Sequence, residues 1–132
     1  MKLNNTSQYA IRIVAFIVKE GYTKKYNAKD IAEKLEIPYK YLTRIMTQLV
    51  EGDIVASTRG KEGGYSLSKN PKEIRVIDIL EAVKECLPQK ECILGIGLCN
   101  ETKKCALHDS WSSPKKAMLD MFKNTTMDSL QV

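Results

Sequence analysis

Several residue types are scarce or confined in this chain of 132 residues, and each scarcity excludes a class of protein. Histidine occurs once and cysteine four times, and all five residues lie between positions 86 and 108. No apolar run approaches the length needed to cross a bilayer, and no secretory signal pattern is present, so we expect no membrane partner. Cysteines in such a protein are more often reduced, metal-bound or reactive than paired in disulfides. We therefore expect a cytoplasmic protein.

Acidic residues are absent from positions 1–19, and the charge of the chain is unevenly spread. Residues 1–75 carry 14 Lys/Arg and 8 Asp/Glu, whereas residues 76–132 carry 7 and 8. A basic N-terminal half favours a polyanionic partner, most plausibly nucleic acid. A solvated basic surface without a partner is the alternative that charge alone leaves open.

Three helices are predicted in the N-terminal half. Apolar residues at helical spacing indicate a buried helix over residues 7–20, a short helix over 28–35 and a third over about 38–50. Asn27 is a favourable N-cap for the second helix, and Pro38 suits the first turn of the third. The third helix is expected to bury Leu42, Ile45, Met46 and Leu49. Its other face carries long, hydrogen-bonding or cationic side chains that suit base edges and phosphates: Tyr39, Lys40, Tyr41, Thr43, Arg44 and Gln48.

The second and third helices are joined by a tight turn, which is typical of a helix-turn-helix but also of any small helical bundle. Residues 53–58 and 65–68 have strand character, and Gly63 and Gly64 between them permit a reversal. The resulting hairpin presents Arg59 and Lys61 at its tip. A cationic hairpin directly after a candidate recognition helix indicates the wing of a winged helix, which contacts phosphates or the minor groove.

The C-terminal half is predicted to contain two further helices. One spans residues 76–85 and is stopped by Pro88; the other follows Cys105 and continues to about residue 123. Pro114 must kink the last helix or start a new segment. Leu107, Trp111, Met118, Met121 and Phe122 form an apolar stripe that suits packing against the same helix of a second subunit.

These patterns predict a mostly α-helical fold with a small β-hairpin, namely a winged helix-turn-helix followed by a long C-terminal dimerisation helix. Residues 1–75 would form the DNA-binding region. Residues 76–132 would form the cysteine loop and the dimerisation helix of the same compact domain. One helix-turn-helix per subunit of a symmetric dimer would fit a pseudo-palindromic site in double-stranded DNA.

The cysteine segment has the spacing Cys86-x5-Cys92-x6-Cys99-x5-Cys105-x2-His108. Thiolates and an imidazole suit an iron–sulfur cluster. They also suit a structural zinc ion, although the short knuckles usual for zinc are absent. Two reactive cysteines alone would suffice for a thiol switch, and four unliganded cysteines are the remaining alternative. No substrate-pocket signature or nucleophile–base pair accompanies the cysteines, so we do not expect an enzyme.

The order of these features resembles the IscR/NsrR-type winged-helix regulators, which bind DNA as homodimers and sense through an iron–sulfur cluster. The matching stretches are KLNNTSQYAIRIV, AKDIAEKLEIPYKYLTRIMTQLVEGDIVASTRGKEGGYSLSKNP, IRVIDILEAV and the final C…C…CALHDSW. The wing stretch STRGKEGGYSL and the three-cysteine loop are the most specific of them. The resemblance covers almost the whole chain and is strongest to the IscR branch.

The resemblance implies a role for individual residues. Tyr39, Lys40, Tyr41, Thr43 and Arg44 would lie on the recognition helix, and Arg59 would reach the minor groove from the wing. Cys92, Cys99 and Cys105 match the three cluster cysteines, and His108 matches the histidine ligand of the IscR branch, with Cys86 as the alternative fourth ligand. This donor set favours [2Fe–2S] over [4Fe–4S]. The implied function is a transcription regulator that senses cluster status, redox state or nitric oxide; thiol oxidation or zinc in the same fold is the alternative.

Overall fold

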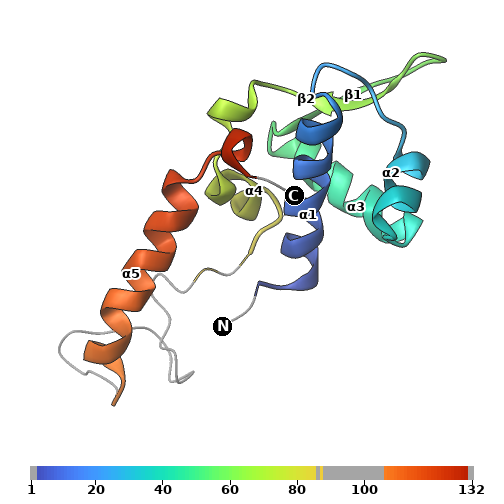
Figure 1. Cartoon of the computed structure of the whole chain (residues 1–132). Helices are drawn as coiled ribbons and strands as arrows, with labels where there is room; N and C mark the ends of the chain where they lie inside the picture. Colours follow the sequence, from blue (N-terminus) through green and yellow to red (C-terminus); the bar gives the residue numbers. More distant parts are fainter. Residues whose placement is uncertain (1–2, 86, 88–105, 131–132) are drawn as a thin grey trace. The chain divides into compact units, whose positions relative to one another are not determined.

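The computed structural model describes residues 3–85, 87 and 106–130 of the chain. Its elements, in order, are α1 (Asn5–Glu20), α2 (Ala28–Leu35), α3 (Tyr39–Glu51), β1 (Val55–Thr58), β2 (Gly64–Leu67), η1 (Pro71–Glu73), α4 (Val76–Ala82), α5 (His108–Asn124) and η2 (Met127–Ser129). The predicted fold is confirmed for this part of the chain, since it consists mostly of helices and has one two-stranded antiparallel hairpin (Figure 1). None of the described helices is long and apolar enough to span a bilayer.

Contacts group the chain into two compact units. One consists of Met1–Glu85 together with Thr125–Val132, and the other is Cys86–Asn124. The functional division predicted at residue 75 does not coincide with this boundary and stays a prediction. The first unit therefore combines the winged helix with α4 and with the short C-terminal segment.

The helix α1 is the central element of the first unit, where it contacts α2, α3, α4, β2 and η2. It begins two residues before the predicted start because the side chain of Asn4 accepts a hydrogen bond of 2.8 Å from the backbone N–H of Ser7. It ends at Gly21, whose φ of +121° is accessible to glycine. Its inner face is fully buried at Ala10, Ile13, Val14 and Ile17.

The helix-turn-helix consists of α2 and α3. Asn27 caps α2 by accepting a hydrogen bond of 2.7 Å from the N–H of Asp30. Glu36 ends α2 in the left-handed conformation, and Ile37 then turns into the core. The residues predicted to form the buried face of α3 are all fully buried, namely Leu42, Ile45, Met46 and Leu49. The opposite face of α3 is thereby directed to solvent.

The wing is the hairpin of β1 and β2, with Val55 opposite Leu67 and Thr58 opposite Gly64. It begins later than predicted because Asp53 adopts a left-handed conformation and Ile54 is turned into the core. Tyr26, which precedes α2, pairs with Tyr65 through two backbone hydrogen bonds of 2.8 and 2.7 Å. The wing is thereby attached to the segment between α1 and α2.

The helix α4 ends three residues before the predicted end, and the cause is local. Lys84 has a φ of +59°, and the N–H of Glu85 donates a hydrogen bond of 2.9 Å to the carbonyl of Leu80. This is the hydrogen-bond pattern of a left-handed C-terminal cap. The prediction that Pro88 stops the helix was therefore wrong, because the helix has ended before it.

The start of α4 is fixed by Arg75 and Asp78. The Asp78 carboxylate accepts hydrogen bonds from the backbone N–H and from the guanidinium of Arg75, both at 2.9 Å. Burial raises the pKa of Asp78, but these hydrogen bonds and the positive charges of Arg75 and Lys69 outweigh it, and the net pKa is lowered. The carboxylate therefore stays ionised at neutral pH and keeps the helix capped.

The C-terminal segment completes the core of the first unit. The N–H of Val76 donates to the carbonyl of Thr125 at 2.9 Å, and the N–H of Met127 donates to the carbonyl of Ile74 at 2.8 Å. Ile74 and Met127 are both fully buried. The core of the winged helix thus includes a residue that follows α5 in sequence.

In the second unit, α5 is one helix that contains Pro114. The sequence predicts a kink or a new segment at this proline, and no new segment begins there. Phe122 is buried, whereas Leu107 and Met121 of the predicted apolar stripe are 42% and 53% exposed. The stripe is therefore only partly covered within one chain.

Candidate nucleic-acid interface

The solvent face of α3 carries several of the side chains that the sequence predicts for DNA binding. Tyr39 is 56% exposed, and Lys40 and Arg44, one helical turn apart, are exposed as well. Thr43 is half-buried, and its hydroxyl donates a hydrogen bond of 2.9 Å to the carbonyl of Lys40. The first two turns of α3 therefore present a phenol and two cations to solvent.

Tyr41 differs from the other predicted contact residues because its side chain packs against α1. Its ring meets the ring of Tyr9 edge-on, with 5.5 Å between the centroids, and a hydrogen bond joins its hydroxyl to that of Thr6. A role on DNA stays a prediction, but this side chain already holds α3 on α1. Tyr41 is next to Leu42 and one helical turn before Ile45, and this spacing was the sequence signal that its side chain lies at the edge of the buried face of α3.

The tip of the wing presents the other predicted cations. Arg59 and Lys61 are exposed, and the turn that carries Lys61 is closed by a hydrogen bond of 3.0 Å from the N–H of Gly63 to the carbonyl of Gly60. Figure 1 shows the hairpin projecting from the first unit beyond the helices. The recognition helix and the wing belong to the same compact unit, so their cations are presented together.

Exchanging Gly64 for alanine is expected to lower the free energy of unfolding by about 1–3 kcal/mol and to loosen the wing. A Cβ atom there would lie 2.7 Å from the carbonyl oxygen of Tyr26, at a φ of +150°. Urea denaturation measures the loss. Gly60→Ala is the matched control, because φ is +111° there but a Cβ would meet nothing within 4 Å. Equal losses in the two variants would contradict the steric role of Gly64.

The predicted metal ligands fall mostly outside the described residues. Cys86, Cys92, Cys99 and Cys105 all lie there, and so does the side chain of His108, whose backbone begins α5. Within the described residues, no group of three or more His, Cys, Asp or Glu is placed to hold a metal ion. The predicted ligand set therefore stays a prediction.

The residue that leads into the cysteine segment is tied to α1. Glu85 accepts a hydrogen bond from the hydroxyl of Ser7, which is 0% exposed. The same turn of α1 carries Thr6, which contacts Tyr41 of the recognition helix. Sequence analysis missed Ser7 and Glu85. A serine on the apolar face of the first helix was a signal that some buried partner must satisfy its hydroxyl.

A helix-turn-helix with an exposed cationic face, followed by a cationic wing, defines a winged-helix DNA-binding protein. The profile of the Rrf2 family, described as an iron-dependent transcriptional regulator, matches residues 3–131. The chain belongs to this family, and it is a transcription regulator with a DNA-binding fold.

Individual relatives are similar over almost the whole chain. The regulator IscR of Pectobacterium atrosepticum is 30% identical over 98% of this chain and 79% of its own length. The Rrf2 protein of Nitratidesulfovibrio vulgaris is also 30% identical, over 98% of this chain and 87% of its own length. Both support the family assignment.

Solved structures confirm the fold. CymR, the global cysteine regulator of B. subtilis, aligns with a TM-score of 0.81 at 23% identity, over 97% of this chain and 94% of its own. IscR of T. potens aligns with a TM-score of 0.73 at 21% identity, over 97% and 85%. The same architecture thus occurs in regulators that carry different names.

Proposed function

We propose that this protein is a cytoplasmic transcription regulator, not an enzyme, that binds a pseudo-palindromic site in double-stranded DNA as a homodimer. The observation that carries the proposal is the joint exposure of Lys40 and Arg44 on α3 and of Arg59 and Lys61 on the wing. A recognition helix of this kind enters the major groove, while wing cations contact phosphates or the minor groove. Basic side chains on one compact unit match the polyanionic surface of a duplex.

The homodimer is supported by α5. Leu107, directly before α5, and Met121, near its end, are exposed apolar side chains of the stripe that the sequence predicts for the dimer contact. A second copy of α5 would bury them. Two-fold symmetry would then place two recognition helices in successive major grooves, roughly 34 Å apart.

The proposed sensor is an iron–sulfur cluster held by Cys92, Cys99, Cys105 and His108, with Cys86 as the alternative fourth ligand. Three thiols and one imidazole within a short segment match the donors that such clusters use. The identity to IscR supports a cluster, and the donor set favours [2Fe–2S] over [4Fe–4S]. A bound cluster would supply a group whose presence or oxidation state responds to iron supply, oxidants or nitric oxide.

Anaerobic purification followed by absorption spectroscopy and by iron, sulfide and zinc analysis tests the sensor. Visible absorption with iron and sulfide is the expected result. A colourless protein with bound zinc, or with free thiols that form a disulfide on oxidation, would establish the alternative sensor in the same regulator. Failure to bind any duplex DNA in every cofactor state would overturn the proposed function itself.

Arg44→Ala is expected to weaken binding to the specific duplex by about 1–3 kcal/mol if the guanidinium makes a bidentate contact to a base edge. Arg59→Ala should cost less if it contacts phosphate alone. Fluorescence anisotropy with specific and random duplexes measures both. Arg→Lys at each position is the matched control, because lysine keeps a phosphate contact but cannot reproduce a bidentate one. An unchanged affinity and salt dependence in Arg59→Ala would contradict the wing assignment.

A further inference from the structure

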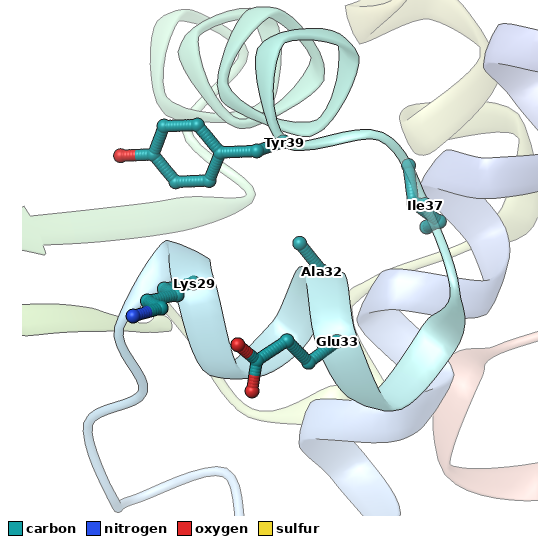
Figure 2. Close-up of a pocket in the computed structure, with 5 residues that line it drawn as sticks. All are labelled: Lys29, Ala32, Glu33, Ile37 and Tyr39. Carbon is teal, nitrogen blue, oxygen red and sulfur yellow. The ribbon is translucent and has the colours of Figure 1, made fainter.

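A hollow of about 430 Å³ lies between α2 and the start of α3. Its lining residues are Lys29, Ala32, Glu33, Ile37 and Tyr39 (Figure 2). Ala32 and Ile37 supply apolar walls, and the three longer side chains stand at its edge. The hollow therefore adjoins the N-terminal end of α3, and helix-turn-helix proteins direct this end of the recognition helix toward the base pairs.

Two of the polar side chains at this hollow, those of Lys29 and Tyr39, are hydrogen-bond donors. Figure 2 shows the ammonium group of Lys29 and the hydroxyl of Tyr39 pointing to the same side, one from each helix of the helix-turn-helix. Both residues are exposed. Within the described part of the chain, Lys29 forms no ion pair, even though Glu33 lies one turn further along α2. Two donors are thus presented to solvent across one opening.

The backbones that carry Lys29 and Tyr39 are held together by the turn between α2 and α3. Ile37 is only 3% exposed, and its N–H donates a hydrogen bond of 3.0 Å to the carbonyl of Ala32. This bond and the burial of Ile37 fix the start of α3 against α2. A ligand that bridges Lys29 and Tyr39 would therefore find both residues on one side of a fixed helix-turn-helix.

We propose that Lys29 and Tyr39 together hold one phosphodiester group of the DNA strand that borders the groove occupied by α3. Lys29 supplies the positive charge of this pair, and it was not among the residues that the sequence predicts for DNA binding. The proposal rests on the proposed DNA-binding function. In a helix-turn-helix the first helix crosses the DNA backbone while the second enters the groove. Lys29 belongs to the first of these helices and Tyr39 begins the second. Such a contact fixes register without carrying sequence information.

Glu33 gives the proposal a second, opposite consequence. Its carboxylate lines the same hollow, so it would repel a phosphate held there. Removing that charge should strengthen binding, whereas removing the Lys29 charge should weaken it. Opposite signs alone would follow for any two opposite charges near DNA, so the change in salt dependence of Lys29→Ala relative to a control lysine decides whether a phosphate is held at the hollow.

The test compares the full-length protein with Lys29→Ala, Tyr39→Phe and Glu33→Gln by anisotropy, on specific and random duplexes, across a series of salt concentrations. Lys29→Ala should weaken binding to both duplexes equally and make the slope of log K against log salt shallower by about 0.9. Tyr39→Phe should weaken binding without changing the slope. Glu33→Gln should raise affinity on the order of twofold at low salt.

Lys34→Ala is the matched control, because Lys34 is an exposed lysine of α2 that does not line the hollow. It should leave the slope unchanged. If Lys29→Ala behaved like Lys34→Ala while the wild-type protein bound DNA, the phosphate site would be refuted and the proposed function would stand. If the wild-type protein bound neither duplex, the phosphate site and the proposed DNA-binding function would both be refuted.

Discussion

Cys92→Ala is expected to abolish the visible absorption and the bound iron of the anaerobically purified protein. The proposed ligand set supplies four donors, and the loss of one thiolate leaves an iron atom incompletely coordinated. We also expect the variant to lose its preference for the specific duplex over a random one. Coupling between two sites is typically about 1–3 kcal/mol, which corresponds to a change of about 5- to 150-fold in relative affinity. If the holo protein and the variant had equal relative affinities for the two duplexes, the cluster would not control the choice of DNA sequence.

The companion variants separate ligands from neighbouring thiols. His108→Ala should lose or alter the cluster spectrum, whereas Cys86→Ser should retain it after anaerobic reconstitution. Cluster retention should also weaken as pH falls through the imidazole range, because a coordinating nitrogen must be deprotonated. The reverse outcome, with the spectrum lost in Cys86→Ser and kept in His108→Ala, would assign the fourth position to Cys86.

Leu42→Ala is expected to lower the free energy of unfolding by about 2–5 kcal/mol. Leu42 is 0% exposed on the inner face of α3, so truncation removes buried apolar area and leaves a cavity beneath the recognition helix. Because small domains are only marginally stable, this loss is a large part of the total. Chemical denaturation followed by circular dichroism measures it.

Val50→Ala is the control for this substitution. Val50 lies on the same helix but is 36% exposed, so its truncation should cost well under half as much. Specific DNA binding by folded Leu42→Ala at low temperature should be nearly retained, since no contact group is removed. Similar losses of stability in the two variants would show that the burial of α3 does not stabilise the first unit.

Local sequence patterns were sufficient to predict the elements that build the interface. The 3.6-residue spacing of Leu42, Ile45 and Leu49 defined both the buried and the exposed face of α3. The glycines between two short strands defined the wing. The end of α4 was missed because it depends on the left-handed conformation of Lys84, a residue type without a preference for that conformation.

The contacts that connect these elements could not be predicted from local patterns. The hydrogen bond between Ser7 and Glu85 joins residues far apart in sequence, as does the packing of Tyr41 on Tyr9. The hollow shared by Lys29 and Tyr39 arises only when α2 and α3 are docked. Each depends on tertiary geometry, which helical periodicity in one segment does not contain.

The burial of Met127 beside Ile74 has a consequence for the order in which the protein matures on the ribosome. The hydrogen bonds that place this C-terminal segment cannot form before residues 125–127 have been synthesised. By then the whole segment from Cys86 to Cys105 has already been translated. Contacts between residues so distant in sequence also close slowly, because the chain between them loses conformational entropy. A nascent chain that ended after α5 would therefore contain all four cysteines while the core of its winged helix was still incomplete.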